Sequence, residues 1–245
     1  MLAIIGGSGL TQFEGLAHLQ RKSVHTPYGN TSVALSFGRI GKSDIVFLAR
    51  HGEGHTLAPH QVNYRANIWA LKQERVREIV AVATVGGIRR EFVPGSLVVP
   101  DQIIDYTWGR ASTFFDGPDA PVTHIDFTEP YSARLRARII DAARACGEPI
   151  AMRGVYAATQ GPRLESAAEI DRLERDGADL VGMTGMPETA LAREAGLDYA
   201  AIAVVVNHAA GRGDSAHGIS LERLDAMLAQ AMVRVRRILQ ELCSQ

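Results

Sequence analysis

The chain has 245 residues, of which 46% are hydrophobic, and its 26 basic and 27 acidic side chains give a net charge of −1. Basic and acidic residues are interspersed without a basic block, which argues against nucleic acid or a membrane surface as a partner and favours small molecules. Cys146 and Cys243 are too few for a disulfide framework or a metal cluster. These properties predict one globular domain over residues 1–245, and the lack of a signal peptide after Met1 predicts a cytoplasmic protein.

Apolar runs predict strands, and apolar residues spaced three and four apart predict helices, along the whole chain. The predicted strands are residues 2–6, 32–39, 44–48, 78–85, 97–100, 102–106, 151–159, 179–182 and 200–206. The predicted helices are residues 59–76, 131–146, 167–176, 188–196 and 221–242. Their alternation predicts an α/β fold, in which the long loop over residues 110–129 would be a lid or a subunit contact.

The last predicted strand, residues 200–206, is an unbroken apolar run, so we expect it to be buried on both faces. It ends in Asn207 and His208. Ligands of open α/β sheets bind outside the carboxyl ends of the strands, so Asn207 is predicted to contact a substrate. His208 has no assigned contact, and we interpret it as a structural or loop-contact residue.

Polar or glycine-rich segments follow four other predicted strands. They contain Ser8, Arg50 with His51, Thr84 with Val85, and Met183 with Thr184. If these strands share one mixed sheet, all five ends would converge on one pocket. The hydroxyls, the guanidinium and the backbone N–H groups suit a phosphate dianion, which needs charge-assisted donors. Met183 and Leu164 would offer apolar contact to a sugar or a flat ring.

The segment over residues 49–55, which contains Arg50, His51 and His55, allows three interpretations. A solvated loop explains the arginine but not the clustering, whereas an anion site explains both. A metal site fits less well, because neither histidine has a His or carboxylate partner at helical spacing. The chain offers no nucleophile activated by a base, so the attacking group is expected to come with the substrates.

Five segments carry a resemblance to a known family, in unbroken order along nearly the whole chain. They are IIGGSGL (4–10), RHG (50–52) with HT (55–56), VNYRANIWALK (62–72), QGPR (160–163), and MT (183–184) with PE (187–188). In these segments the chain resembles the trimeric purine nucleoside phosphorylases, most of all the methylthioadenosine phosphorylase branch. The resemblance implies a mixed central β-sheet or distorted barrel flanked by helices. It also implies a homotrimer, or a hexamer built from two trimers, and reversible phosphorolysis of a nucleoside without a cofactor, inorganic phosphate being the co-substrate.

The resemblance also implies roles for individual residues. Phosphate would contact Ser8, Arg50, His51, Thr84, Val85 and Thr184, with His51 and Asn207 as the catalytic residues. Met183 would pack on the ribose, and His124 would reach a neighbouring subunit's site near the sugar 5′ position. Leu164 stands where the family usually has a phenylalanine against the base, which weakens the expected stacking.

Two departures from the methylthioadenosine branch bear on the purine base. That branch has aspartate at the positions of Asn207 and Ala209, which suits an adenine amino group. An amide instead accepts from N7–H and donates to a 6-keto oxygen. At the position of Glu165 that branch has serine, whereas a glutamate there resembles the 6-oxopurine enzymes. The Glu165 carboxylate can accept a hydrogen bond from N1–H of the base. These residues predict hypoxanthine or guanine as the base.

At the other end of the nucleoside, Leu221 and Leu224 form an apolar i, i+3 pair where the 6-oxopurine enzymes have a histidine near the 5′-hydroxyl. The pair suits a 5′-methylthio group; the alternative is that both leucines are only core residues of the last helix. The predicted reaction is phosphorolysis of 5′-methylthioinosine to hypoxanthine and 5-methylthioribose 1-phosphate. Methylthioadenosine and general 6-oxopurine nucleosides are the alternative substrates; a hydrolytic nucleosidase and a non-catalytic nucleoside-binding protein are the alternative functions.

Overall fold

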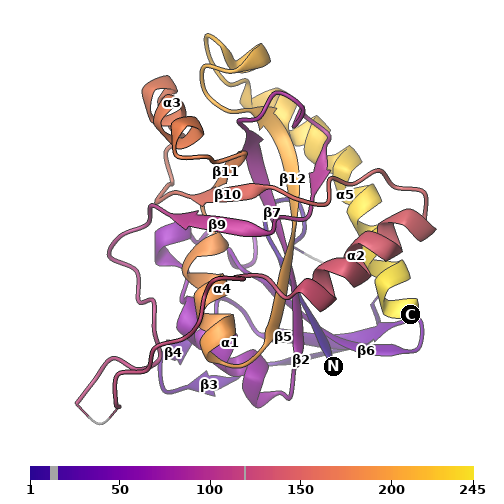
Figure 1. The fold of residues 1–245 in the computed structure, drawn as a ribbon. Coiled ribbons are helices and arrows are strands. Elements are labelled where there is room, and N and C mark those ends of the chain that lie inside the picture. Colours follow the sequence, from indigo (N-terminus) through magenta and orange to yellow (C-terminus); the bar gives the residue numbers. More distant parts are fainter. Residues whose placement is uncertain (12–15, 119) are drawn as a thin grey trace.

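A ten-stranded mixed sheet runs through the computed structural model (Figure 1). The structure describes residues 1–11, 16–118 and 120–245, and for residues 17–19 and 221–226 it describes the backbone only. Its path is β2-β5-β6-β1-β7-β11-β10-β9, and β12 and β8 join it through β7. Its strands are β1 (Leu2–Gly6), β2 (Ala17–Lys22), β5 (Leu35–Ile40), β6 (Ser43–Ala49), β7 (Glu78–Gly87), β8 (Leu97–Val98), β9 (Gln102–Asp105), β10 (Val155–Ala158), β11 (Leu180–Gly182) and β12 (Asp198–His208). A separate two-stranded sheet pairs β3 (His25–Thr26) with β4 (Gly29–Asn30).

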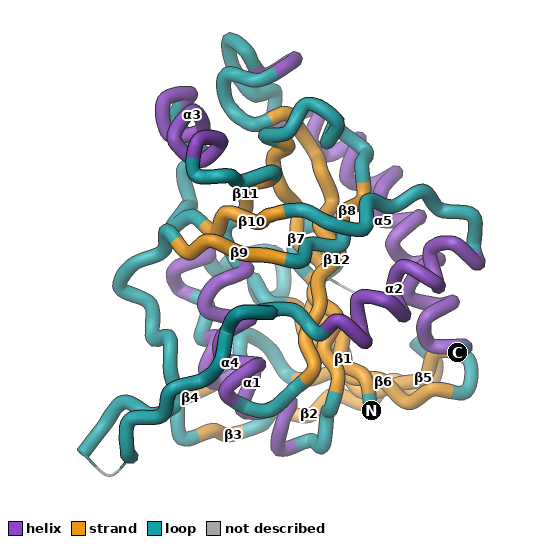
Figure 2. The backbone as a smooth tube through the Cα atoms, viewed as in Figure 1, coloured by secondary structure: helices purple, strands orange, loops and turns teal. Residues whose placement is uncertain are grey.

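Helices cover both faces of the central strands, as Figure 2 shows. They are α1 (Tyr64–Gln73), α2 (Ala133–Ala145), α3 (Ala167–Arg175), α4 (Gly185–Glu194) and α5 (Leu221–Ser244). Alternate residues of β1 enter different cores, because Ile4 packs with residues of α2 and α5, whereas Ala3 and Ile5 pack with residues of α1 and α4. A strand that is buried on both faces reads as a continuous apolar run, which explains the sequences of β1, β7 and β12. The predicted α/β fold with a mixed sheet flanked by helices is confirmed.

One predicted helix, residues 59–76, is two elements in the structure. A 3-10 turn (Pro59–Gln61) ends at Val62, whose backbone is extended, and α1 begins after Asn63. The Asn63 side chain accepts a hydrogen bond from the Ala66 N–H at 3.1 Å and so caps the new helix. The sequence prediction also missed β2, β3 and β4, because β2 is largely polar and the other two have only two residues each.

Among the described helices, none has both the length and the apolar character needed to cross a bilayer.

Candidate active site

A cavity of about 430 Å³ lies at the ends of the five strands that were predicted to converge. Its lining includes these predicted residues: Ser8, Arg50, His51, Thr84, Val85, Leu164, Glu165, Met183, Thr184, Asn207 and Ala209. The sheet explains the convergence. Strands β6, β1, β7 and β12 are parallel neighbours and end at the same edge, and the short β11 brings its own end beside β7.

One predicted residue, His124, does not line this cavity in the described part of the chain, and two others cannot be placed. His124 is exposed and is not part of the described lining. The side chains of Leu221 and Leu224 lie outside the described residues, although Ile219, just before α5, lines the cavity.

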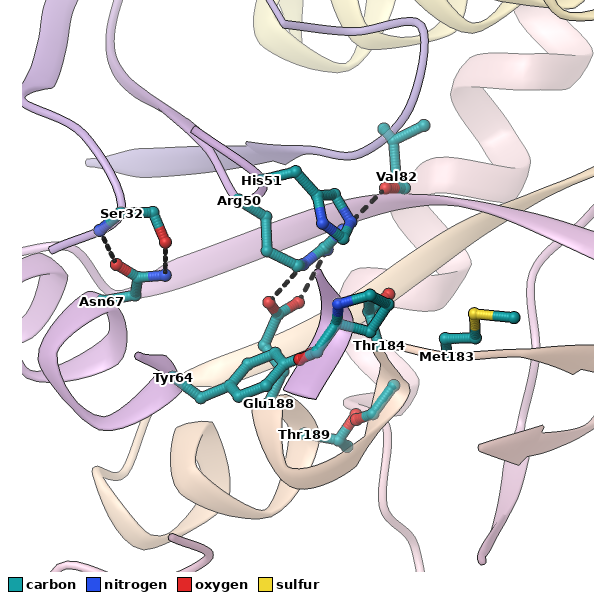
Figure 3. Close-up of polar contacts among 12 residues, drawn as sticks. Ser32, Arg50, His51, Tyr64, Asn67, Val82, Met183, Thr184, Glu188 and Thr189 are labelled. Atoms are coloured by element: carbon teal, nitrogen blue, oxygen red, sulfur yellow. Dashed lines mark hydrogen bonds and ion pairs between the residues drawn. The ribbon is translucent and has the colours of Figure 1, made fainter. Parts of the chain in front are cut away.

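Arg50 follows β6, and its guanidinium faces the Glu188 carboxylate (Figure 3). Only 1% of the Arg50 side chain is exposed. Its Nε donates to Oε2 of Glu188 at 2.6 Å, its Nη2 donates to Oε1 at 2.9 Å, and its Nη1 lies 3.4 Å from the Val82 carbonyl. Burial alone would lower the pKa of this guanidinium, but the Glu188 carboxylate raises it overall, so Arg50 stays charged. Because Nε and Nη2 both bind Glu188, Nη1 is the nitrogen of this guanidinium that does not bind the carboxylate.

His51 is a neutral donor–acceptor in the same wall of the cavity. Burial, followed by the nearby Arg50 charge, lowers its pKa from 6.5 to about 4. Its Nδ1 lies 2.8 Å from the Leu57 carbonyl, which can only accept, so Nδ1 carries the proton. The Nε2 lone pair of the neutral ring is therefore an acceptor.

Asn207 is directed by a bulge in β12. Val205 pairs with Val85 and Asn207 pairs with Gly86, so Val206 is an extra residue on this strand. The Asn207 Nδ2 donates one hydrogen to the His208 carbonyl at 2.6 Å, which leaves one N–H and the Oδ1 for a ligand.

His208 contacts the loop that follows it. Its Nδ1 accepts from the Asp214 N–H at 3.4 Å, and the ring packs closely against Gly213. The interpretation of His208 as a loop-contact residue is confirmed.

The segment after β10 carries Leu164 and Glu165 to the cavity. The Thr159 hydroxyl donates to Oε1 of Glu165 at 2.6 Å, which fixes the orientation of the carboxylate. Nearby, Gly161 has φ of +58° and packs against Met183, so that a β-carbon at this position would lie 2.4 Å from the methionine sulfur. Residues of the described chain form no cluster of three or more His, Cys, Asp or Glu side chains suited to a metal ion.

The sequence profile of the phosphorylase superfamily matches residues 1–244. The chain belongs to this superfamily. A protein of Pseudomonas syringae pv. tomato, described as "probable S-methyl-5′-thioinosine phosphorylase", is 52% identical over 242 residues, covering 99% of this chain and 98% of that protein. The 6-oxopurine nucleoside phosphorylase of Pyrococcus furiosus is 47% identical over 215 residues, covering 86% of this chain and 80% of that protein.

Among solved structures, methylthioadenosine phosphorylase from Schistosoma mansoni in complex with adenine matches with a TM-score of 0.94 at 34% identity. The match covers 99% of this chain and 90% of that one. These relatives confirm the family resemblance and make this superfamily member a pentosyltransferase of the purine nucleoside phosphorylase type.

Sequence reasoning missed two residues that bond to residues at the site, Glu188 and Arg110. Glu188 belongs to a quoted motif, but its pairing with Arg50 was not predicted. The available signal in the sequence was the position of Arg50 directly after an apolar strand. An arginine there is expected to be buried, and a buried cation requires a partner. Arg110 was missed as well, and nothing in its sequence neighbourhood marks it.

Proposed function

We propose that the protein catalyses phosphorolysis of 5′-methylthioinosine, giving hypoxanthine and 5-methylthioribose 1-phosphate. The observation that carries this proposal is that Asn207 and Glu165 line one cavity together with Ala209. Ala209 stands where the methylthioadenosine branch has an aspartate. The free N–H of Asn207 would donate to the purine 6-keto oxygen and its Oδ1 would accept from N7–H. Glu165, oriented by Thr159, would accept from N1–H.

Phosphate would bind at the opposite side of the cavity. Ser8, Thr84, Val85 and Thr184 would supply hydroxyl and backbone donors, together with Nη1 of Arg50. The neutral His51 would accept from the hydroxyl of hydrogenphosphate through Nε2, a role that an imidazolium could not perform. Inorganic phosphate is the co-substrate, and the reaction would need no cofactor.

In the proposed mechanism the glycosidic bond breaks first, and C1′ becomes oxocarbenium-like. Asn207 would stabilise the charge that develops on the departing purine, and phosphate would attack C1′ from the opposite face. The negative charge of phosphate would also stabilise the cationic sugar. Met183 would pack on the ribose, and Leu164 on the base.

The 5′-methylthio group would lie against Leu221 and Leu224. The position of Ile219 supports this proposal, because it places an apolar side chain in the cavity two residues before α5 begins. We further propose a cytoplasmic homotrimer, or a hexamer of two trimers, in which His124 reaches the 5′ end of a neighbouring site. The exposure of His124 in the single chain is consistent with that role.

Phosphate dependence tests the reaction class. Hypoxanthine release from 5′-methylthioinosine should require phosphate and should be accompanied by an equal amount of 5-methylthioribose 1-phosphate. Both products can be followed by chromatography in matched buffers with and without phosphate. Turnover that is unaffected by the omission of phosphate would instead indicate a hydrolase, and no purine release in either buffer would indicate a binding protein.

A further inference from the structure

Arg110 lies in the chain segment after β9, next to residues 159–160 and 183–186. It is partly buried and is not among the described residues that line the cavity. Its guanidinium nevertheless bonds to the segments that follow two different strands of the sheet.

On the β10 side, Nη2 of Arg110 donates to the carbonyl of Gln160 at 2.8 Å and lies 3.2 Å from that of Thr159. Its Nε donates to the Gln160 side-chain oxygen at 3.2 Å. This segment leads directly into residues 161–165, which carry Leu164 and Glu165.

On the β11 side, Nη1 of Arg110 donates to the carbonyls of Met183 at 2.8 Å and Met186 at 2.6 Å. The same Nη1 lies 3.3 Å from the Tyr64 hydroxyl, and the guanidinium lies over the Tyr64 ring at 5.6 Å. The bonded carbonyls flank Thr184, so their orientation determines how Met183 and Thr184 face the cavity.

A guanidinium suits this position because its five N–H groups point in fixed, planar directions. One edge faces the β10 segment and the other faces the β11 segment. A lysine ammonium has three donors at a single point and cannot serve both groups of carbonyls. A partly buried carbonyl left without a donor is destabilised, which favours rearrangement of the segment that carries it.

We propose that Arg110 is a positioning residue that sets the spacing between two walls of the cavity. One wall, residues 161–165, would contact the purine, and the other, Met183 with Thr184, would contact ribose and phosphate. Loss of the guanidinium lets the two walls move independently. The inference rests on the proposed function for its assay, since the effect is measured as phosphorolysis.

The test compares Arg110→Met with Arg136→Met. Arg136 is also partly buried and also donates to backbone carbonyls, those of Pro100 and Met152, but it does not belong to the described cavity lining. A displacement of about 1 Å at a reacting centre costs roughly a hundredfold, so kcat/KM of Arg110→Met should fall at least about tenfold. Arg136→Met should lose about as much thermal stability as Arg110→Met, but its kcat/KM should stay within about twofold of that of the unmodified protein.

Chemical rescue separates positioning from general destabilisation. Millimolar guanidinium should restore part of kcat/KM to Arg110→Ala in a saturable manner and should leave Arg136→Ala unchanged. A folded Arg110→Met with kcat/KM within about threefold of the unmodified protein would overturn the inference, as would equal losses in both Met variants. If Arg110→Met does not fold, Arg110→Lys is judged by the same criterion. An unmodified protein without phosphorolytic activity would instead reject the proposed function.

Discussion

At the scale of single residues, the cavity combines a charged group that is already paired with a histidine that is kept neutral. Glu188 accepts hydrogen bonds from Nε and Nη2 of the Arg50 guanidinium, and both side chains are 1% exposed. Removing either partner would leave a buried charge without compensation, at a cost of about 3–5 kcal/mol. The pair therefore fixes the direction of Nη1 before any ligand arrives. His51 adds an acceptor beside this donor, and its neutrality has a measurable consequence.

The low pKa of His51 should make stability depend on pH. The pKa is about 4 in the folded protein against 6.5 in the unfolded chain, so below pH 6.5 protons bind preferentially to the unfolded chain. Between pH 7 and pH 5 this residue should lower the free energy of unfolding by about 2 kcal/mol. His51→Gln removes this contribution, so denaturant unfolding of the two proteins should differ in pH dependence by that amount. Parallel pH profiles would show that His51 is not held neutral.

At the scale of elements, β10 and β11 set two walls of the cavity side by side. They are parallel neighbours that pair Ala158 with Gly182, and the Thr159 N–H donates to the Gly182 carbonyl at 2.8 Å. The segments after them are therefore adjacent, which allows Gly161 to pack on Met183. Both strands could be predicted from their apolar runs. Their pairing could not, because a register between segments more than twenty residues apart depends on the packing of the whole sheet.

Gly161→Ala should weaken substrate binding as well as lower stability. The new methyl group would displace the Met183 side chain from its proposed contact with the ribose, and losing about 1 kcal/mol of apolar contact would raise the nucleoside KM roughly fivefold. Gly196→Ala is the matched control, because its φ of +69° is similar and a β-carbon there meets no atom within 4 Å. Both variants should lose about 1 kcal/mol of stability through backbone strain. Equal KM values in steady-state assays of the two variants would contradict this arrangement.

At the scale of the whole molecule, the sheet collects residues from positions 7 to 219 in one cavity. The sequence could indicate these strand ends, since polar groups after buried strands are the general signature of a ligand site. It could not indicate the partners that hold them. Glu188 lies 138 residues from Arg50, and Arg110 lies 73 residues from Met183. Such supporting contacts depend on how distant segments fold together and leave no local pattern.

The proposed trimer predicts complementation between two impaired variants. If His124 completes a neighbouring site, His124→Ala and Asn207→Ala should each lose activity alone but restore it when co-expressed. In random mixed trimers, roughly a quarter of the sites would combine an intact cavity with an intact neighbouring His124. Activity of the mixture above the mean of the two separate variants is the expected result. Activity equal to that mean, or a fully active His124→Ala, would contradict the shared site.

The central claim is that Asn207 and Glu165 select a 6-oxopurine base, in a nucleoside whose 5′-methylthio group would lie against Leu221 and Leu224. The most direct test is kcat/KM for 5′-methylthioinosine, 5′-methylthioadenosine, inosine and adenosine, each with saturating phosphate. Mispairing of a buried polar group costs about 1–3 kcal/mol, so 5′-methylthioinosine should exceed 5′-methylthioadenosine by roughly ten- to a hundredfold. Asn207→Asp should narrow this ratio, and inosine should rank below 5′-methylthioinosine. An adenine nucleoside that equals or exceeds 5′-methylthioinosine would contradict the account.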